Sequence, residues 1–77
     1  MSVLAYKVGR CLLLQRLQDA YMTQQELANE MGITVQQINK YVHNRQKMSI
    51  EVAGNIAFIL GCEIKHLYEW IEVGEIE

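Results

Sequence analysis

The segment from Thr23 to Val42 constrains the fold of this chain more than any other part of the sequence. It opens with Thr23 three residues before Glu26, the spacing of a capping box at a helix N-terminus. Gly32 follows, and glycine adopts most easily the left-handed backbone that ends a helix. Thr34 then provides a second N-cap before another amphipathic run. The pattern therefore predicts two short helices joined by a tight turn, over residues 24–31 and 35–42.

Two short helices joined by a glycine-containing turn are typical of the DNA-binding helix-turn-helix. The small side chain of Ala28 leaves room for the second helix to cross the first, and Ile33 is placed to anchor the turn in the core. The N-terminal end of the second helix enters the major groove in this motif, so polar side chains there can reach base edges. The segment thus favours duplex DNA as a ligand.

The remaining sequence is also helical in pattern. Its 77 residues allow one small domain, and 51% of them are apolar, which is enough for a core. Further helices are predicted over residues 8–20, 50–60 and 63–72, with Ser49 as a cap and Gly61 as a terminator. The side chains expected to face inward are Cys11, Leu13, Leu14, Leu17, Ala20, Tyr21, Leu27, Ala28, Met31, Ile33, Ile38, Tyr41, Val42, Ala53, Ile56, Ala57, Leu60, Ile64, Leu67, Tyr68 and Ile71. We therefore expect an all-α domain of five helices over residues 1–77, with residues 1–7 as an N-terminal extension and residues 73–77 as an acidic tail.

The charges are distributed unevenly along the chain, although the net charge is only −2. Between Met31 and Ile50 the charged residues are Lys40, Arg45 and Lys47, and no acid is present. From Glu51 onward a single lysine accompanies the glutamates at positions 51, 63, 69, 72, 75 and 77. Because affinity for DNA comes largely from cations near phosphates, this basic middle is compatible with a nucleic-acid ligand without requiring one.

Other classes of protein find little support. The longest uncharged run, residues 52–62, is far shorter than the roughly 20 residues of a membrane span, and the N-terminus lacks the pattern of a secretion signal. Cys11 and Cys62 are expected to be reduced core thiols. Cys62 and His66 could share a helix face, but two ligands do not make a zinc site, so no metal or cofactor is expected. No paired carboxylates, Ser/His/Asp set or phosphate loop indicates an enzyme, and we expect none.

The stretches TQQELANEMGIT and IEVAGNIAFILGCEIKHLY keep a common register over most of the chain. Over about Val8 to Tyr68 the sequence resembles the Cro-like phage repressors and the bacterial regulators related to them. The resemblance implies a lambda-repressor-like fold with the helix-turn-helix at helices two and three. It also implies a transcriptional regulator, most simply a prophage or bacterial repressor, acting in the cytoplasm of a bacterium or a phage-infected host.

The same resemblance implies roles for individual side chains. The residues nearest the bases would be Val35, Gln36 and Gln37, followed one turn later by Asn39 and Lys40. Gln36 is the strongest candidate, because glutamine can pair with N6 and N7 of adenine in a bidentate way. Phosphate contacts would come from Gln24, which also braces the recognition helix, and from Thr34, His43, Asn44, Arg45 and Lys47.

Two departures from the family pattern affect the fold. Many members bury an arginine of helix one against a glutamate after the recognition helix, where this chain has Leu17 and Val42. An apolar contact can replace such an ion pair without loss of stability. Asn44 occupies the position of a turn glycine, and asparagine tolerates the left-handed backbone well.

Several apolar residues bear on partners. Phe58, Trp70 and Ile71, together with residues 3, 4 and 6, could form a homodimer interface, or they could complete a marginal core. Dimers of this motif bind half-sites about 34 Å apart. An alternative function is an antitoxin or anti-repressor that uses the same fold to bind a protein, which Phe58 and the acidic C-terminus favour.

Overall fold

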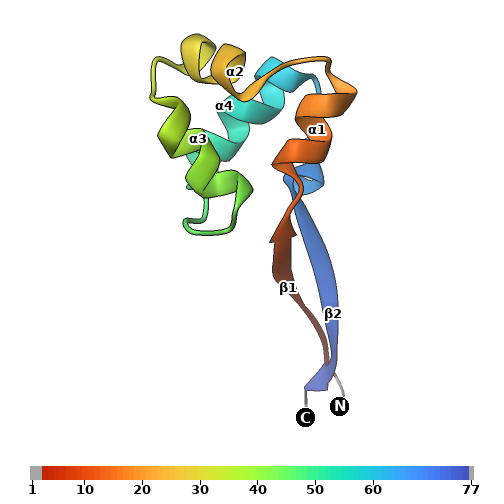
Figure 1. Cartoon of the computed structure of the whole chain (residues 1–77). Coiled ribbons are helices and arrows are strands. Elements are labelled where there is room, and N and C mark those ends of the chain that lie inside the picture. The colour runs from red at the N-terminus through yellow and green to blue at the C-terminus, as the bar shows by residue number, and fades with distance from the viewer. Residues whose placement is uncertain (1–2, 77) are drawn as a thin grey trace.

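A computed structural model describes residues 3–76 as a small helical body with a two-stranded ribbon projecting from it (Figure 1). The start of β1 and the end of β2 pair with each other at the far end of the ribbon. In chain order the elements are β1 (Val3–Cys11), α1 (Leu13–Asp19), α2 (Gln24–Met31), α3 (Val35–Val42), α4 (Ile50–Leu60), the 3₁₀ turn η1 (Ile64–Leu67) and β2 (Tyr68–Ile76). Within the described residues no helix is long and apolar enough to cross a membrane.

The three middle helices α2, α3 and α4 have the bounds that the capping residues predict. Thr23 and Glu26 form the complete capping box, and the Thr34 and Ser49 side chains each accept a hydrogen bond from the third residue of the helix that follows. Gly32 and Gly61 end α2 and α4 in the left-handed conformation, with φ of 67° and 71°. Local hydrogen bonds therefore determine where these helices begin and end.

The prediction of an all-α fold with five helices is wrong at both ends of the chain. The first helix begins at Leu13 instead of residue 8, and residues 63–72 form a 3₁₀ turn followed by a strand. Residues 3–7 and 73–76, expected to form an N-terminal extension and an acidic tail, belong to the two strands. The two segments contain β-branched and aromatic residues, which favour strands, and they pair with each other along the ribbon.

The ribbon is antiparallel, and its register brings the two chain ends together. Tyr6 lies opposite Glu72, Lys7 opposite Ile71 and Val8 opposite Trp70. Irregularities in the register follow Leu4 and Val8. A Cβ on Gly9 would lie 2.6 Å from Cδ1 of Ile71, so the glycine leaves space for that side chain to cross the strand.

The hydrophobic core lies between the helices and the base of the ribbon. Its fully buried large side chains are Leu13, Leu17, Leu27, Ile38, Ile56 and Leu67. Leu17 is buried, and Val42 packs partly buried against the same core.

Some side chains expected in the core are instead exposed. Tyr21 is 96% exposed, and Leu14, Ile64 and Ile71 also lie at the surface, since the helix and strand boundaries differ from those predicted. Phe58 is 88% exposed, and Trp70 is also exposed. These dimer candidates therefore do not complete the core.

Candidate nucleic-acid interface

The turn between α2 and α3 holds the two helices against each other. The amide of Ile33 donates to the carbonyl of Ala28 (3.1 Å), and Ile33 packs against the core. Ile38 and Tyr41 are buried on the inner face of α3. On the opposite face of α3, Gln36 and Lys40 are exposed to solvent.

The outer face of α3 borders a shallow hollow of about 380 Å³. Its lining residues are Val35, Gln36, Asn39, Lys40 and Arg45. Gln36 and Lys40 are exposed, whereas Val35 and Asn39 are half-buried. The structure therefore places four of the five predicted base-reading residues around one concave surface and adds Arg45, for which a phosphate contact was predicted.

Gln37, the fifth predicted base reader, is not among the residues that line this hollow. Its Nε2 donates to Oε1 of Gln46 in the loop after α3, at 3.0 Å. The bond joins the first turn of α3 to that loop and uses the Nε2 group of Gln37 as its donor. Sequence reasoning had not identified Gln46, because nothing in the local pattern pairs residues nine positions apart across a loop.

Gln24 and Thr34 lie at the N-terminal ends of the two helices. Oε1 of Gln24 accepts a hydrogen bond from Nδ2 of Asn39 at 3.4 Å, which links the start of α2 to the middle of α3. The hydroxyl oxygen of Thr34 accepts from the amide of Gln37 at 3.1 Å. Contacts of Gln24 and Thr34 with phosphate remain predictions.

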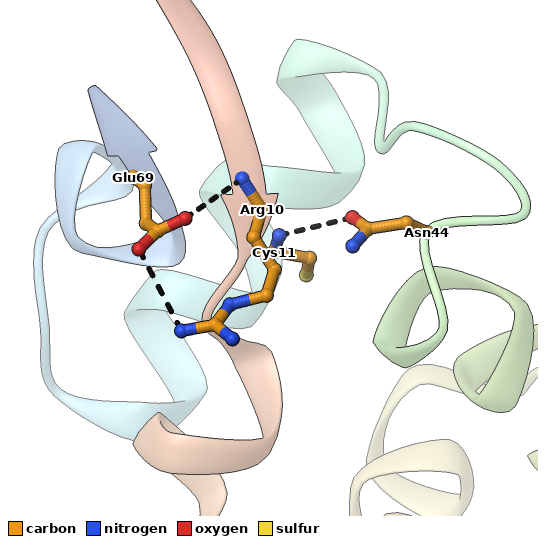
Figure 2. A network of polar contacts seen from close by, with 4 residues as sticks. All are labelled: Arg10, Cys11, Asn44 and Glu69. Atoms are coloured by element: carbon orange, nitrogen blue, oxygen red, sulfur yellow. Dashed lines mark hydrogen bonds and ion pairs between the residues drawn. The ribbon is translucent and has the colours of Figure 1, made fainter. Parts of the chain in front are cut away.

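The loop after α3 is fixed at both ends to the strands. Asn44 has a φ of 60°, as predicted for its left-handed position, and its Oδ1 accepts from the amide of Cys11 at 2.9 Å (Figure 2). At the other end, the amide of Met48 donates to the Tyr68 hydroxyl at 2.9 Å. The exposed Arg45 and Lys47 lie between these two anchors. The side-chain oxygen of Asn44 is therefore used in a hydrogen bond within the protein. The predicted contact of Asn44 with phosphate would have to come from its other groups.

His43 lies apart from the hollow on α3. It is exposed at the end of that helix and borders a second hollow of about 280 Å³, together with Arg10 and Gln18. A phosphate contact by His43 would therefore occur on a different part of the surface from the side chains that line the first hollow.

Among the side chains that the structure describes, the cations of this surface form no ion pairs. Among residues 3–76 the ion pairs join Arg10 to Glu69, Arg16 to Asp19 and Lys65 to Glu63. None of them involves Lys40, Arg45 or Lys47, whose charges are therefore available to a polyanion.

The two cysteines have the character of core thiols. Burial raises the pKa of Cys11 and of Cys62, which keeps both side chains protonated at neutral pH. Burial also raises the pKa of Tyr68, so its hydroxyl stays protonated. In the part of the chain that the structure describes, no group of three or more acidic, histidine or cysteine side chains could hold a metal ion.

Comparison with known proteins agrees with this geometry. Residues 13–72 match the Cro/C1-type HTH DNA-binding domain, which covers all four α-helices and the first part of β2. No curated protein matches the chain.

Proposed function

Because this chain belongs to the Cro/C1-type helix-turn-helix DNA-binding family, we propose that it regulates transcription by reading specific duplex DNA in the major groove with α3. The simplest regulator of this kind is a repressor in a bacterium or a phage-infected host. The observation that carries the proposal is the hollow lined by Val35, Gln36, Asn39, Lys40 and Arg45. It combines side chains that distinguish bases with cations at one surface.

The side chains of α3 divide into two chemical groups. Gln36 carries an exposed amide on the first turn, where it can pair with N6 and N7 of adenine, and Val35 can contact a thymine methyl group. Asn39 is oriented by its bond to Gln24, which preorganises one amide of the reading surface. These residues would determine which sequence is bound.

The loop after α3 would position the protein on the DNA backbone. Arg45 and Lys47 are exposed, and hydrogen bonds at Asn44 and Met48 hold the two ends of their loop against β1 and β2. Phosphate contacts from such a loop set the register of a recognition helix without reading sequence. Since one helix with few cations binds weakly, we propose a homodimer that reads two half-sites.

The test is selection of binding sites from random duplexes, followed by affinity measurements on the selected motif. We expect a short motif with two related halves. Gln36→Ala should weaken binding by about 1–3 kcal/mol and relax the preference at one base pair. Gln25→Ala is the matched control, since Gln25 is exposed on α2 and bonds only to Asn29 of the same helix among the described residues. Equal loss in the two variants, or no enriched motif at low salt, would contradict the proposal.

A second candidate function rests on Phe58. This side chain is 88% exposed on α4, beside a hollow of about 280 Å³ lined also by Glu30, Met31, Asn55 and Ile59. An exposed aromatic ring next to apolar neighbours suits a protein partner, as an antitoxin or an anti-repressor requires. Under this function a purified partner protein binds tightly, Phe58→Ala weakens that binding, and Gln36→Ala leaves it unchanged.

A further inference from the structure

The ribbon projects from the helical body (Figure 1). In the described residues its sheet contains two strands only, so each strand has an outer edge without a neighbouring strand. Isolated two-stranded ribbons are marginally stable in water. Tyr6 is 61% exposed and Trp70 is 53% exposed, so the ribbon also leaves aromatic surface uncovered. An added strand would supply the missing neighbour of one edge.

The charges differ sharply between the two strands. β1 carries Lys7 and Arg10 and no acid, whereas β2 carries glutamates at positions 69, 72 and 75 and no base. Within the ribbon two acidic side chains of β2 find partners on β1. Arg10 forms an ion pair with Glu69 (3.6 Å), and the Tyr6 hydroxyl donates a hydrogen bond to Glu72 (3.3 Å). The partition therefore supports the pairing of β1 with β2 inside one chain.

The same partition distinguishes the two free edges. Two β2 edges placed together would bring glutamates opposite each other, which is destabilising, and charged edge strands resist pairing in general. The run from Val3 to Val8 in β1 contains a single charge, Lys7. Only β1 therefore offers an edge suited to pairing with its own copy.

Asn44 defines where this edge ends. At the base of the ribbon Glu69 lies on one side of β1 and Asn44 on the other (Figure 2). The bond from the Cys11 amide to Asn44 occupies the outer edge at this point. The free edge therefore lies towards the far end of the ribbon, away from the helical body.

We propose that the outer edge of β1 pairs antiparallel with β1 of a second copy, giving a four-stranded sheet in the order β2–β1–β1–β2. This inference rests on the homodimer of the proposed function and identifies its interface. The contact is the same on both copies, as a closed two-fold dimer requires.

The length of the ribbon fits the spacing of DNA half-sites. Opposed residues of antiparallel strands share a face, so a two-fold axis must pass through a residue and its own copy. If that residue is Tyr6, near the centre of the apolar run, ten residue steps separate the two Cys11 positions, which is about 33 Å at about 3.3 Å per residue. Half-sites one helical turn apart are separated by about 34–36 Å. The ribbon thus places two helical bodies at opposite ends of the joint sheet, at a distance comparable to the half-site spacing.

The test compares one charge added to each strand, with the monomer–dimer equilibrium measured by sedimentation. Tyr6→Lys brings two lysines together near the two-fold axis but leaves each beside Glu72 of its own chain. Val73→Glu is the matched control on β2, two residues beyond Ile71, the partner of Lys7. We expect Tyr6→Lys to raise the dimer dissociation constant at least about tenfold and Val73→Glu to change it by less than about threefold. Circular dichroism of both variants checks that the ribbon is retained.

A cysteine scan locates the axis independently. Directly opposed residues of antiparallel strands have Cα atoms about 4.5–5.5 Å apart, which suits a disulfide. Tyr6→Cys should therefore give an oxidised dimer, while Ala5→Cys, which would lie opposite Lys7 of the second copy, should not. Val73→Cys and the wild type, with its native thiols at Cys11 and Cys62, should not form one either.

Several outcomes would overturn the proposed interface: a monomeric wild type at high concentration, equal effects of Tyr6→Lys and Val73→Glu, or an open series of larger species. Binding of the Tyr6→Lys variant to a duplex with a single half-site distinguishes failure of the interface from failure of the proposed function. If the variant binds the half-site but β1 forms no interface, the interface is refuted and DNA recognition is supported. If β1 links a dimer that selects no DNA motif, the interface is supported and DNA recognition is refuted.

Discussion

At the scale of single residues, Asn44 connects the recognition helix to the ribbon. Its left-handed backbone turns the chain at the end of α3, and its side chain accepts the hydrogen bond of the Cys11 amide in β1. Tyr68 holds the other end of the same loop from β2. Two side chains thus position Arg45 and Lys47, although neither of them carries the charge that DNA would bind.

Two substitutions at Asn44 should separate its backbone role from its side-chain role. Asn44→Gly keeps the left-handed conformation but removes the acceptor for Cys11, so the free energy of unfolding should fall by about 0.5–1.5 kcal/mol. Asn44→Ala should cost about 1–2 kcal/mol more, because alanine is strained at positive φ. Urea denaturation measures both values. Equal stability of the two variants would show that the backbone conformation carries no cost.

The raised pKa of Tyr68 predicts a loss of stability in alkaline solution. Because burial raises the folded-state pKa above the ordinary value of 10.0, the unfolded chain loses this proton first as pH rises. The stabilising contribution is complete below pH 10 and declines above it. Tyr68→Phe should be less stable at neutral pH, having lost the acceptor for Met48, and its stability should fall less steeply above pH 10 than that of the wild type. Parallel stability curves for the two proteins, measured by thermal unfolding against pH, would contradict this.

At the scale of elements, short helices depend on their caps and on the helices that they contact. The helix α2 has eight residues, too few for a stable isolated helix. It supports α3 through the turn at Ile33 and through the bond between Gln24 and Asn39. Loss of the α2 cap should therefore destabilise the whole helix-turn-helix.

Removing the cap of α2 tests this dependence. Thr23→Ala leaves the amide of Glu26 without its side-chain acceptor and should lower the free energy of unfolding by about 1 kcal/mol. Thr23→Ser keeps a hydroxyl in the same place and should preserve most of the stability. Chemical denaturation of the three proteins provides the comparison, and an alanine variant as stable as the serine variant would show that the cap contributes nothing.

At the scale of the whole molecule, charge distribution matters more than net charge. The chain carries −2 overall, yet its glutamate-rich strand β2 is part of the ribbon, while Lys40, Arg45 and Lys47 lie on α3 and the loop after it. Each phosphate contact made by a cation adds a term of about 0.9 to the dependence of the logarithm of affinity on the logarithm of salt concentration. A small number of cations predicts a shallow salt dependence.

The salt dependence of DNA binding should respond to Arg45. Arg45→Ala should weaken binding to all sequences alike and reduce the salt slope by about 1. Lys65→Ala removes the same charge from η1, where it is paired with Glu63, and should leave the slope unchanged. Fluorescence titrations of a labelled duplex at several salt concentrations measure the slopes. An equal reduction in both variants would indicate that only net charge matters.

The sequence by itself determined the helices whose hydrogen bonds are local. The cap residues Thr23, Thr34 and Ser49 and the terminators Gly32 and Gly61 predict α2, α3 and α4 to the residue, because each bond joins groups within a few positions of each other. The same register identified the residues that line the α3 hollow.

Only the tertiary structure decided the ends of the chain and the details of the surface. Strand β1 finds its hydrogen-bond partners in β2, more than fifty residues away, so a local apolar stripe could not distinguish strand from helix there. For the same reason the bonds of Gln37 to Gln46 and of Asn44 to Cys11 were not predictable, since folding, and not spacing along the chain, brings those groups together.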